Sequence, residues 1–283
     1  MSRLTTRNHN RDSAGMTYVY PVLSRRAGGL SIGINLNTNN ACNWRCIYCQ
    51  VPGLVRGKPQ PVDLGLLRDE LTQLLEQSLS GVFFEHYGIA PSQRVIRDIA
   101  LSGNGEPTLS PDFAAVVETI GRVTATLGLT DTVGRVLITN GSGTDRITVR
   151  QGLRELARQG GEVWFKVDDV TPTGIRHINQ VHLTLETLYR RLAIVTRLCD
   201  TQLQTCLFGR TDDSNDVLNR TAYLDFLIEL QKRKIPLKGI LLYGLARPSH
   251  QPEAAVLTRL PAGEIESFAT MIRALGYSVR ADE

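Results

Sequence analysis

The segment ACNWRCIYCQ, residues 41–50, places three cysteines within eight positions. Cys42, Cys46 and Cys49 form a C-x3-C-x2-C pattern just after residues 31–37, a short apolar run that predicts a β-strand. Disulfides need cysteines in pairs, and a closed zinc site needs four ligands. Thiolates at this spacing can instead bind three irons of a [4Fe–4S] cluster, which leaves the fourth iron open for another ligand.

A zinc site is the alternative use of these thiols, and it needs a fourth ligand. The closest histidines in sequence, His9 and His86, both lie more than 30 residues from the loop. Cys199 and Cys206 lie about 150 residues downstream and are predicted to be buried hydrophobic side chains, as free cysteines usually are. The sequence therefore favours an iron–sulfur cluster with one open position over a zinc knuckle.

The composition is that of a globular protein with a hydrophobic core, because 42% of the 283 residues are hydrophobic and 21% are charged. No apolar stretch approaches the length of a membrane span, and the polar N-terminus lacks the apolar block of a secretory signal. We therefore expect a cytoplasmic protein without membrane contacts, with a flexible tail at residues 1–16 and a single domain at 17–283. In a reducing compartment, clustered cysteines bind metal more often than they form disulfides.

Positive charge is concentrated in residues 1–60, which contain eight lysines and arginines and one acidic residue, Asp12. The remaining 223 residues hold 24 basic and 27 acidic side chains, so the excess charge is local. This basic segment would suit an anionic partner, such as a nucleotide or an RNA. A solvated basic tail is an equally good interpretation.

Short β-rich runs alternate with amphipathic stretches along the chain, which is typical of a parallel sheet covered by helices. The runs that predict strands are 31–37, 94–102, 134–140, 162–168, 201–209, 237–244 and 277–281. The stretches that predict helices are 63–80, 111–127, 144–159, 184–199, 216–234 and 263–275. We therefore predict an α/β fold, a partial (β/α)6 TIM-like barrel, in which functional residues gather at the carboxyl ends of the strands.

The segment SGNGEPT, residues 102–108, follows the second predicted strand. Gly103 and Gly105 allow the backbone to approach a ligand closely, whereas Pro107 keeps the preceding Glu106 in an extended turn. The carboxylate of Glu106 can then accept hydrogen bonds from an ammonium group. A simple turn followed by a helix cap is the alternative explanation.

Polar residues also occur at the ends of the next predicted strands. Thr139 and Asn140 end the third strand in a Thr-Asn-Gly sequence, which also forms ordinary tight turns. Lys166 and Asp168 lie on one face of the fourth strand, and if that face points into the barrel they need a ligand or a mutual salt bridge. Other residues that could line the barrel mouth are Gln204, Tyr243, Arg247 and His250.

The cysteine loop, with Tyr48 just before its third cysteine, resembles the loop of the radical S-adenosylmethionine (radical SAM) superfamily. The resemblance covers most of the chain. Residues 24–36, 102–109 and 244–253 (SRRAGGLSIGINL, SGNGEPTL and GLARPSHQPE) are similar to a group of Fe–S oxidoreductases related to the wyosine-type tRNA-modifying synthases. The resemblance implies that the three cysteines bind a [4Fe–4S] cluster whose open iron binds S-adenosylmethionine (SAM).

The same resemblance implies that the reduced cluster cleaves SAM to methionine and a 5′-deoxyadenosyl radical, which abstracts a hydrogen atom from the substrate. It places Tyr48 near the adenine. It also places Gly105 and Glu106 in the motif that holds the SAM amine, although Asn104 stands where that motif has its first glycine. The other predicted cofactor-binding residues are Gly103, Thr139, Asn140, Lys166 and Asp168.

The leading hypothesis is therefore a radical SAM enzyme that acts on an unknown substrate and takes its electron from a donor such as flavodoxin or ferredoxin. Modification of a tRNA base is one candidate, since the basic residues 1–60 fit an RNA substrate. The wyosine-type synthases, however, carry a second set of cysteines, whereas this chain has only Cys199 and Cys206 left. A hypothesis of a different class is a non-catalytic Fe–S or zinc protein that binds RNA.

Overall fold

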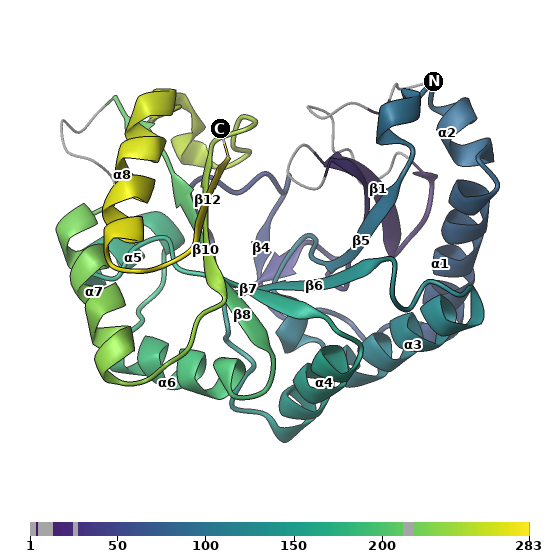
Figure 1. Ribbon diagram of the computed structural model, residues 1–283, viewed down its shortest axis with the longest axis horizontal. Helices are drawn as coiled ribbons and strands as arrows, with labels where there is room; N and C mark the ends of the chain where they lie inside the picture. The colour runs from purple at the N-terminus through teal and green to yellow at the C-terminus, as the bar shows by residue number, and fades with distance from the viewer. Residues whose placement is uncertain (1–3, 5–13, 25–27, 212–217, 283) are drawn as a thin grey trace.

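The computed structural model describes residues 4, 14–24, 28–211 and 218–282. Its centre is an eight-stranded sheet that curls into an open half-barrel (Figure 1). The strands, in spatial order, are β1 (Val19–Ser24), β2 (Gly29–Ile34), β5 (Ile96–Leu101), β6 (Gly134–Thr139), β7 (Glu162–Lys166), β8 (Asp200–Leu207), β10 (Gly239–Gly244) and β12 (Val279–Asp282). Neighbouring strands are parallel from β2 to β12, whereas β1 is antiparallel to β2. The predicted partial TIM-like barrel is confirmed, with one antiparallel strand added at its edge.

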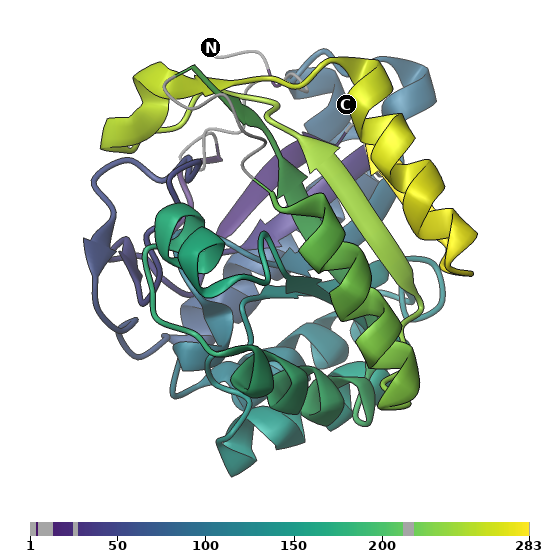
Figure 2. The ribbon, with the colours of Figure 1, turned by 90° about the vertical axis from the view of Figure 1, so that its left-hand side faces the viewer.

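Helices connect the parallel strands, and most of them cover the outer face of the curled sheet (Figures 1 and 2). They are α1 (Leu64–Leu79), α2 (Val82–His86), α3 (Phe113–Thr126), α4 (Ile147–Arg158), α5 (Pro172–Asn179), α6 (Leu185–Thr196), α7 (Arg220–Lys232) and α8 (Ala262–Ala274). The 3-10 helices are η2 (Pro91–Gln93), η3 (Pro107–Leu109) and η4 (Pro252–Val256). Two small ribbons pair β3 (Ala41–Cys42) with β4 (Val55–Arg56), and β9 (Gly209–Arg210) with β11 (Leu257–Thr258).

Helix α1 shows how the sequence determines these elements. Asp63 is its N-cap, and the Asp63 carboxylate accepts a hydrogen bond from the N–H of Leu66 (3.0 Å). Leu67, Leu71 and Leu74 recur at helical spacing and are buried in the main hydrophobic core. The same amphipathic pattern predicts this helix from the sequence.

Strand β1 is absent from the sequence prediction. Pro21 lies inside its apolar run, and a proline there argues against a central strand but is compatible with an edge strand. The buried carboxylate of Glu70, on α1, holds the start of this edge by accepting hydrogen bonds from the N–H groups of Thr17 (2.7 Å) and Tyr18 (2.8 Å). The strand therefore depends on a contact between distant parts of the chain.

Helix α5 is also absent from the prediction, although Thr171 and Pro172 form a recognisable N-cap and N1 proline. The helix predicted at 216–234 begins at Arg220, and residues 212–217 lie outside the described residues. The remaining predicted helices are present with shifts of a few residues at their ends.

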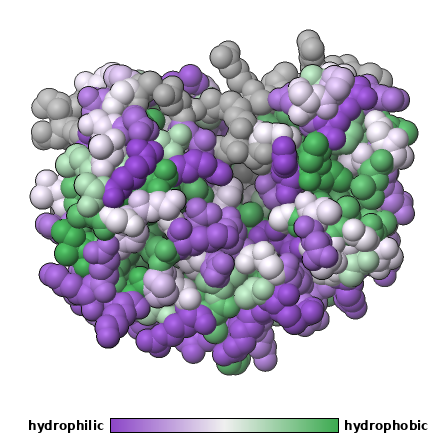
Figure 3. Space-filling model, in the orientation of Figure 1, coloured by the Kyte–Doolittle hydropathy of each residue, from purple (hydrophilic) through white to green (hydrophobic). Residues whose placement is uncertain are grey.

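Most of the predicted tail, residues 1–16, also lies outside the described residues, so the division into a tail and one domain stays a prediction. Leu4 and Met16, which are described, contact the main hydrophobic core. In the described part of the chain, every helix is too short or too polar to span a bilayer. The face shown in Figure 3 intersperses hydrophilic and hydrophobic residues.

Candidate functional site

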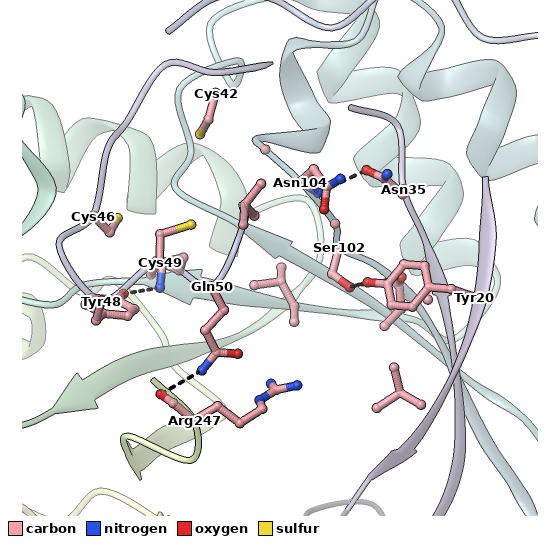
Figure 4. Close-up of a pocket in the computed structure, with 18 of the residues that line it drawn as sticks. Tyr20, Asn35, Cys42, Cys46, Tyr48, Cys49, Gln50, Ser102, Asn104 and Arg247 are labelled. Atoms are coloured by element: carbon pink, nitrogen blue, oxygen red, sulfur yellow. Dashed lines mark hydrogen bonds between the residues drawn. The ribbon is translucent and has the colours of Figure 1, made fainter. Parts of the chain in front are cut away.

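The cysteine loop, residues 41–50, follows β2 and forms one side of a cavity of about 1370 Å³ inside the half-barrel (Figure 4). On the opposite side, the hydroxyl groups of Tyr20 and Ser102 lie 3.0 Å apart. The predicted site residues that line the cavity are Cys42, Cys46, Tyr48, Cys49, Gly103, Gly105, Glu106, Asn140, Lys166, Gln204, Tyr243, Arg247 and His250. Thr139 and Asp168 are buried and contact these lining residues.

A small hydrophobic cluster, separate from the main core, supports the cysteine loop. Its members are Ile47, Tyr48, Ile178, Cys206, Phe208 and Leu245. The end of α5 adds backbone hydrogen bonds on both sides of Cys46. The N–H of Arg45 donates to the carbonyl of Asn179 (3.2 Å), and the N–H of Ile47 donates to the carbonyl of Ile178 (2.9 Å). Helix α5 therefore fixes the backbone around this thiol.

Residues 247–253, which we call the C-terminal clamp, hold the other end of the cysteine loop. The hydroxyl of Ser249 donates to the carbonyl of Ile47 (2.7 Å). The N–H of His250 donates to the carbonyl of Cys49 (2.9 Å). Because Ser249 is buried, its hydroxyl satisfies a carbonyl that water does not easily reach.

The C-terminal clamp also contains charged and amide contacts to the loop. Both terminal nitrogens of Arg45 donate to the carboxylate of Glu253 (2.9 and 2.6 Å), and these hydrogen bonds lower the pKa of Glu253. The side-chain amide of Gln251 donates to the carbonyl of Val51 (3.2 Å). The loop is therefore tied to a segment about 200 residues downstream.

We expect Ser249→Ala to lower the free energy of unfolding of the iron-free protein by about 1–2 kcal/mol, because a buried carbonyl loses its donor. Chemical denaturation followed by circular dichroism measures this change. Ser80→Ala is the matched control, since Ser80 is exposed and its hydroxyl donates to Gln77 within the end of α1. Equal effects of the two substitutions would show that the clamp contact does not stabilise the loop.

Asn43 joins the cysteine loop to the turn that follows β6. Its side-chain amide donates to the hydroxyl of Ser142 (2.7 Å) and accepts a hydrogen bond from the amide of Asn140 (3.1 Å). The predicted Thr-Asn-Gly turn thus packs directly against the loop. A contact of Thr139 or Asn140 with SAM stays a prediction.

Gly103 and Gly105 are required by the close approach of the segment that leads from β2 into the cysteine loop. A Cβ on Gly103 would collide with the side chain of Asn35, and a Cβ on Gly105 would collide with the carbonyl of Ala41. The side chain of Asn35 also accepts a hydrogen bond from the N–H of Asn104 (3.0 Å). These glycines therefore let two parts of the chain pack together, and their contact with a ligand stays a prediction.

The carboxylate of Glu106 is buried and joins Thr108 of η3 to Thr139 and Asn140 at the end of β6. Its Oε1 accepts hydrogen bonds from the hydroxyls of Thr108 (2.6 Å) and Thr139 (2.5 Å), and its Oε2 accepts one from the N–H of Asn140 (2.6 Å). Burial raises the pKa of Glu106. A second donor at Oε2, such as an ammonium group in the cavity, would stabilise the ionised carboxylate.

Lys166, Tyr48 and Asp168 form a chain of hydrogen bonds. The ammonium of Lys166 donates to the hydroxyl of Tyr48 (2.5 Å), which donates to the carboxylate of Asp168 (2.6 Å). Lys166 and Asp168 are also an ion pair at 3.7 Å. Burial opposes the charge of Lys166, but Asp168 together with Tyr243, Cys46 and Cys206 raises the pKa of Lys166 well above its usual range. The salt bridge considered from the sequence is therefore present.

Burial and the nearby Asp168 also raise the pKa of Tyr48, so this residue is a neutral phenol and Lys166 is an ammonium at neutral pH. The hydroxyl of Tyr48 is thus committed to the charged pair, while its ring contacts Phe208. The adenine contact expected of Tyr48 stays a prediction, as do contacts of Lys166 and Asp168 with SAM.

The three loop thiols share one cavity but are not grouped as a finished metal site. Within the described ranges, no set of three His, Cys, Asp or Glu side chains is arranged to hold a metal ion. Burial raises the pKa of Cys42 to about 11 and also raises that of Cys46, so metal binding must release protons. Three soft sulfur ligands on one loop nevertheless fit an iron–sulfur cluster. Their roles as ligands stay predictions.

Sequence reasoning missed Asn179 and Ser249, which contact the cysteine loop from 133 and 202 residues away. A single asparagine or serine in a connecting segment carries no local signal of such a contact. Cys199 and Cys206 are buried, as predicted, although Cys206 also lines the cavity.

No family model matches this sequence. A UPF0026 protein from Helicobacter pylori is 32% identical over 101 residues, which are 35% of this chain and 29% of that protein. The chain spans less than a third of the length of the curated relatives that it matches.

Solved structures that are similar along most of the chain include TYW1 and SuiB. TYW1 with a lysine–pyruvate adduct bound matches with a TM-score of 0.56 and 17% identity, over 86% of this chain and 73% of TYW1. SuiB from Streptococcus suis, bound to S-adenosylmethionine, matches with a TM-score of 0.58 and 8% identity, over 92% of this chain and 52% of SuiB. At these identities the similarity concerns the fold. This chain therefore shares the partial-barrel fold of these two structures.

Proposed function

We propose that this protein is a radical SAM enzyme in which Cys42, Cys46 and Cys49 bind a [4Fe–4S] cluster and SAM binds beside it. The proposal rests on one observation above all, the convergence of these thiols with Glu106 and Lys166 in a single cavity. The cysteine spacing and the shared fold support it. The cavity is also larger than a typical small-molecule pocket, which leaves room for a substrate.

The residues of the chain have separate tasks in this proposal. When bound, the reduced cluster supplies the electron that cleaves SAM to methionine and a 5′-deoxyadenosyl radical. Glu106 accepts a hydrogen bond from the SAM ammonium through Oε2, which receives only the Asn140 N–H from the described residues. Lys166 offers positive charge to the SAM carboxylate or a donor to its ribose, and Asp168 keeps Lys166 charged.

The direct test is anaerobic reconstitution of the cluster followed by incubation with dithionite and SAM. We expect 5′-deoxyadenosine and methionine to form in amounts that depend on iron content, because SAM cleavage needs the reduced cluster. Chromatography with mass spectrometry measures both products. A fully loaded cluster that yields no 5′-deoxyadenosine would favour the non-catalytic Fe–S or zinc protein instead.

Modification of a tRNA base is a narrower form of the proposal. The similarity to TYW1, a wyosine synthase, favours it. The cysteine count does not, because Cys199 lies in the main core and Cys206 in the cluster beneath the cysteine loop, which leaves no second set of clustered thiols. Unchanged tRNA nucleosides in a deletion strain would exclude this substrate. A flavodoxin or ferredoxin as the electron donor is also part of the proposal.

A further inference from the structure

Asn179, the last residue of α5, lies between the cysteine loop and Asp168. Its side chain is buried, with an exposed fraction of 1%. Its Nδ2 donates to the Sγ of Cys46 at 3.2 Å and to Oδ2 of Asp168 at 2.8 Å. Because a carboxylate can only accept hydrogen bonds, the atom of Asn179 that faces Asp168 must be the amide nitrogen. Its second hydrogen is then available to the sulfur.

The backbone around Asn179 is held in place on both sides. Gln180 has φ 57° and ends α5 in the left-handed conformation. The carbonyl of Asn179 accepts a hydrogen bond from Arg45 in the cysteine loop (3.2 Å), and the carbonyl of Gln180 accepts one from Arg56. These contacts fix the backbone that carries the Asn179 amide, so the fold determines where the amide lies.

We propose that Asn179 is a positioning residue whose amide hydrogen-bonds the Cys46 sulfur when Cys46 binds the cluster, and that this bond raises the reduction potential of the cluster. The inference rests on the function proposed above. An N–H donor directed at a ligand sulfur stabilises the additional negative charge of the reduced state, and such bonds are among the factors that set cluster potentials. Asp168 acts through Asn179, because it accepts the other amide hydrogen and so orients the group.

The bond also links the two halves of the site. Asp168 accepts hydrogen bonds from both Asn179 and Tyr48, and Tyr48 in turn accepts one from Lys166. A single buried carboxylate therefore orients the donor to the cluster ligand on one side and the cation of the SAM pocket on the other. Loss of Asn179 should affect the cluster side first, since Tyr48 and Lys166 keep their own contacts with Asp168.

Two substitutions of Asn179 test the inference. N179L removes the donor at similar size, and N179D keeps the shape but places a carboxylate against both the sulfur and the Asp168 carboxylate. We expect the midpoint potential of the reconstituted cluster, measured without SAM by a reductive titration followed by electron paramagnetic resonance, to fall in the order wild type, N179L, N179D. The expected change for N179L is about tenfold in the reduction equilibrium, which is 59 mV for a one-electron couple.

Q180N is the matched control, since it changes a neighbouring amide that does not contact the cysteines and asparagine tolerates the left-handed conformation. Its potential should equal that of the wild type. If N179L does not hold iron, N179A, which removes the same donor without adding bulk or charge, provides the comparison of potentials. If the wild type and the Asn179 variants have equal midpoint potentials, or if Q180N shifts the midpoint potential as much as they do, the role proposed for Asn179 is wrong. The proposed function of the protein would still stand. Absence of a cluster or of 5′-deoxyadenosine in the wild type would overturn the proposed function itself.

Discussion

Cys46→Ala is expected to abolish cluster loading. The substitution leaves only two of the three loop thiols, Cys42 and Cys49, to bind the cluster. The backbone of the loop should keep its place, because the α5 contacts of Arg45 and Ile47 involve main-chain atoms. Iron and sulfide analysis after anaerobic reconstitution, together with the visible absorption of the cluster, measures the loss.

The control for this experiment is Cys199→Ala. The thiol of Cys199 is buried in the main core and donates to the carbonyl of Gly161 (3.3 Å), so its removal should leave the iron content unchanged. Cys206 is a weaker control, because it lines the cavity, although we expect the same result. Normal cluster loading in the Cys46 variant, or loss of loading in the Cys199 variant, would show that the metal site lies elsewhere in the chain.

Glu106→Gln is expected to weaken SAM binding about 100-fold, which corresponds to roughly 2.7 kcal/mol. A hydrogen bond between an ammonium and a carboxylate contributes more than a neutral one, and the neutral amide of Gln loses this advantage. The new NH2 group would also oppose either the N–H of Asn140 or the hydroxyls of Thr108 and Thr139, all of which are donors. Equilibrium binding of SAM to the reconstituted protein measures the change.

Glu70→Gln provides a matched control, because Glu70 is also a buried carboxylate that accepts backbone hydrogen bonds but lies on α1 against β1. We expect it to reduce stability and to leave the SAM affinity of the folded protein unchanged. If the two substitutions weaken SAM binding equally, Glu106 acts only through the stability of the fold, and its role as the ammonium ligand is wrong.

The alternation of strands and helices in the sequence predicts the parallel strands and most of their connecting helices, because each of these elements carries its own local pattern. Strand β1 escapes such a prediction, since Pro21 breaks its pattern and the strand is completed by the carboxylate of Glu70, about 50 residues away. Helix α5 is different, because the Thr171-Pro172 signal is local and was available in the sequence. Its eight residues are simply short for a periodic pattern.

In the candidate site, too, some features follow from the local sequence and others depend on contacts between distant segments. The strand-end positions of Glu106 and Asn140 follow from the βα order, and both residues line the cavity. The hydrogen bonds that Glu106 accepts, and the contact of Asn179 with Cys46, depend on how separate loops meet. Sequence alone also does not show that the atoms of Asn35 exclude a side chain at Gly103.

The distance in sequence between the cysteine loop and its C-terminal clamp affects how the protein is made. A ribosome releases the loop 202 residues before Ser249, and Glu253 emerges later still. Until then the nascent loop lacks the hydrogen bonds that Ser249 and Glu253 make with it. If the loop binds the cluster as proposed, we expect stable iron binding only in an almost complete chain, because a premature stop before residue 249 leaves all five thiols but removes these contacts.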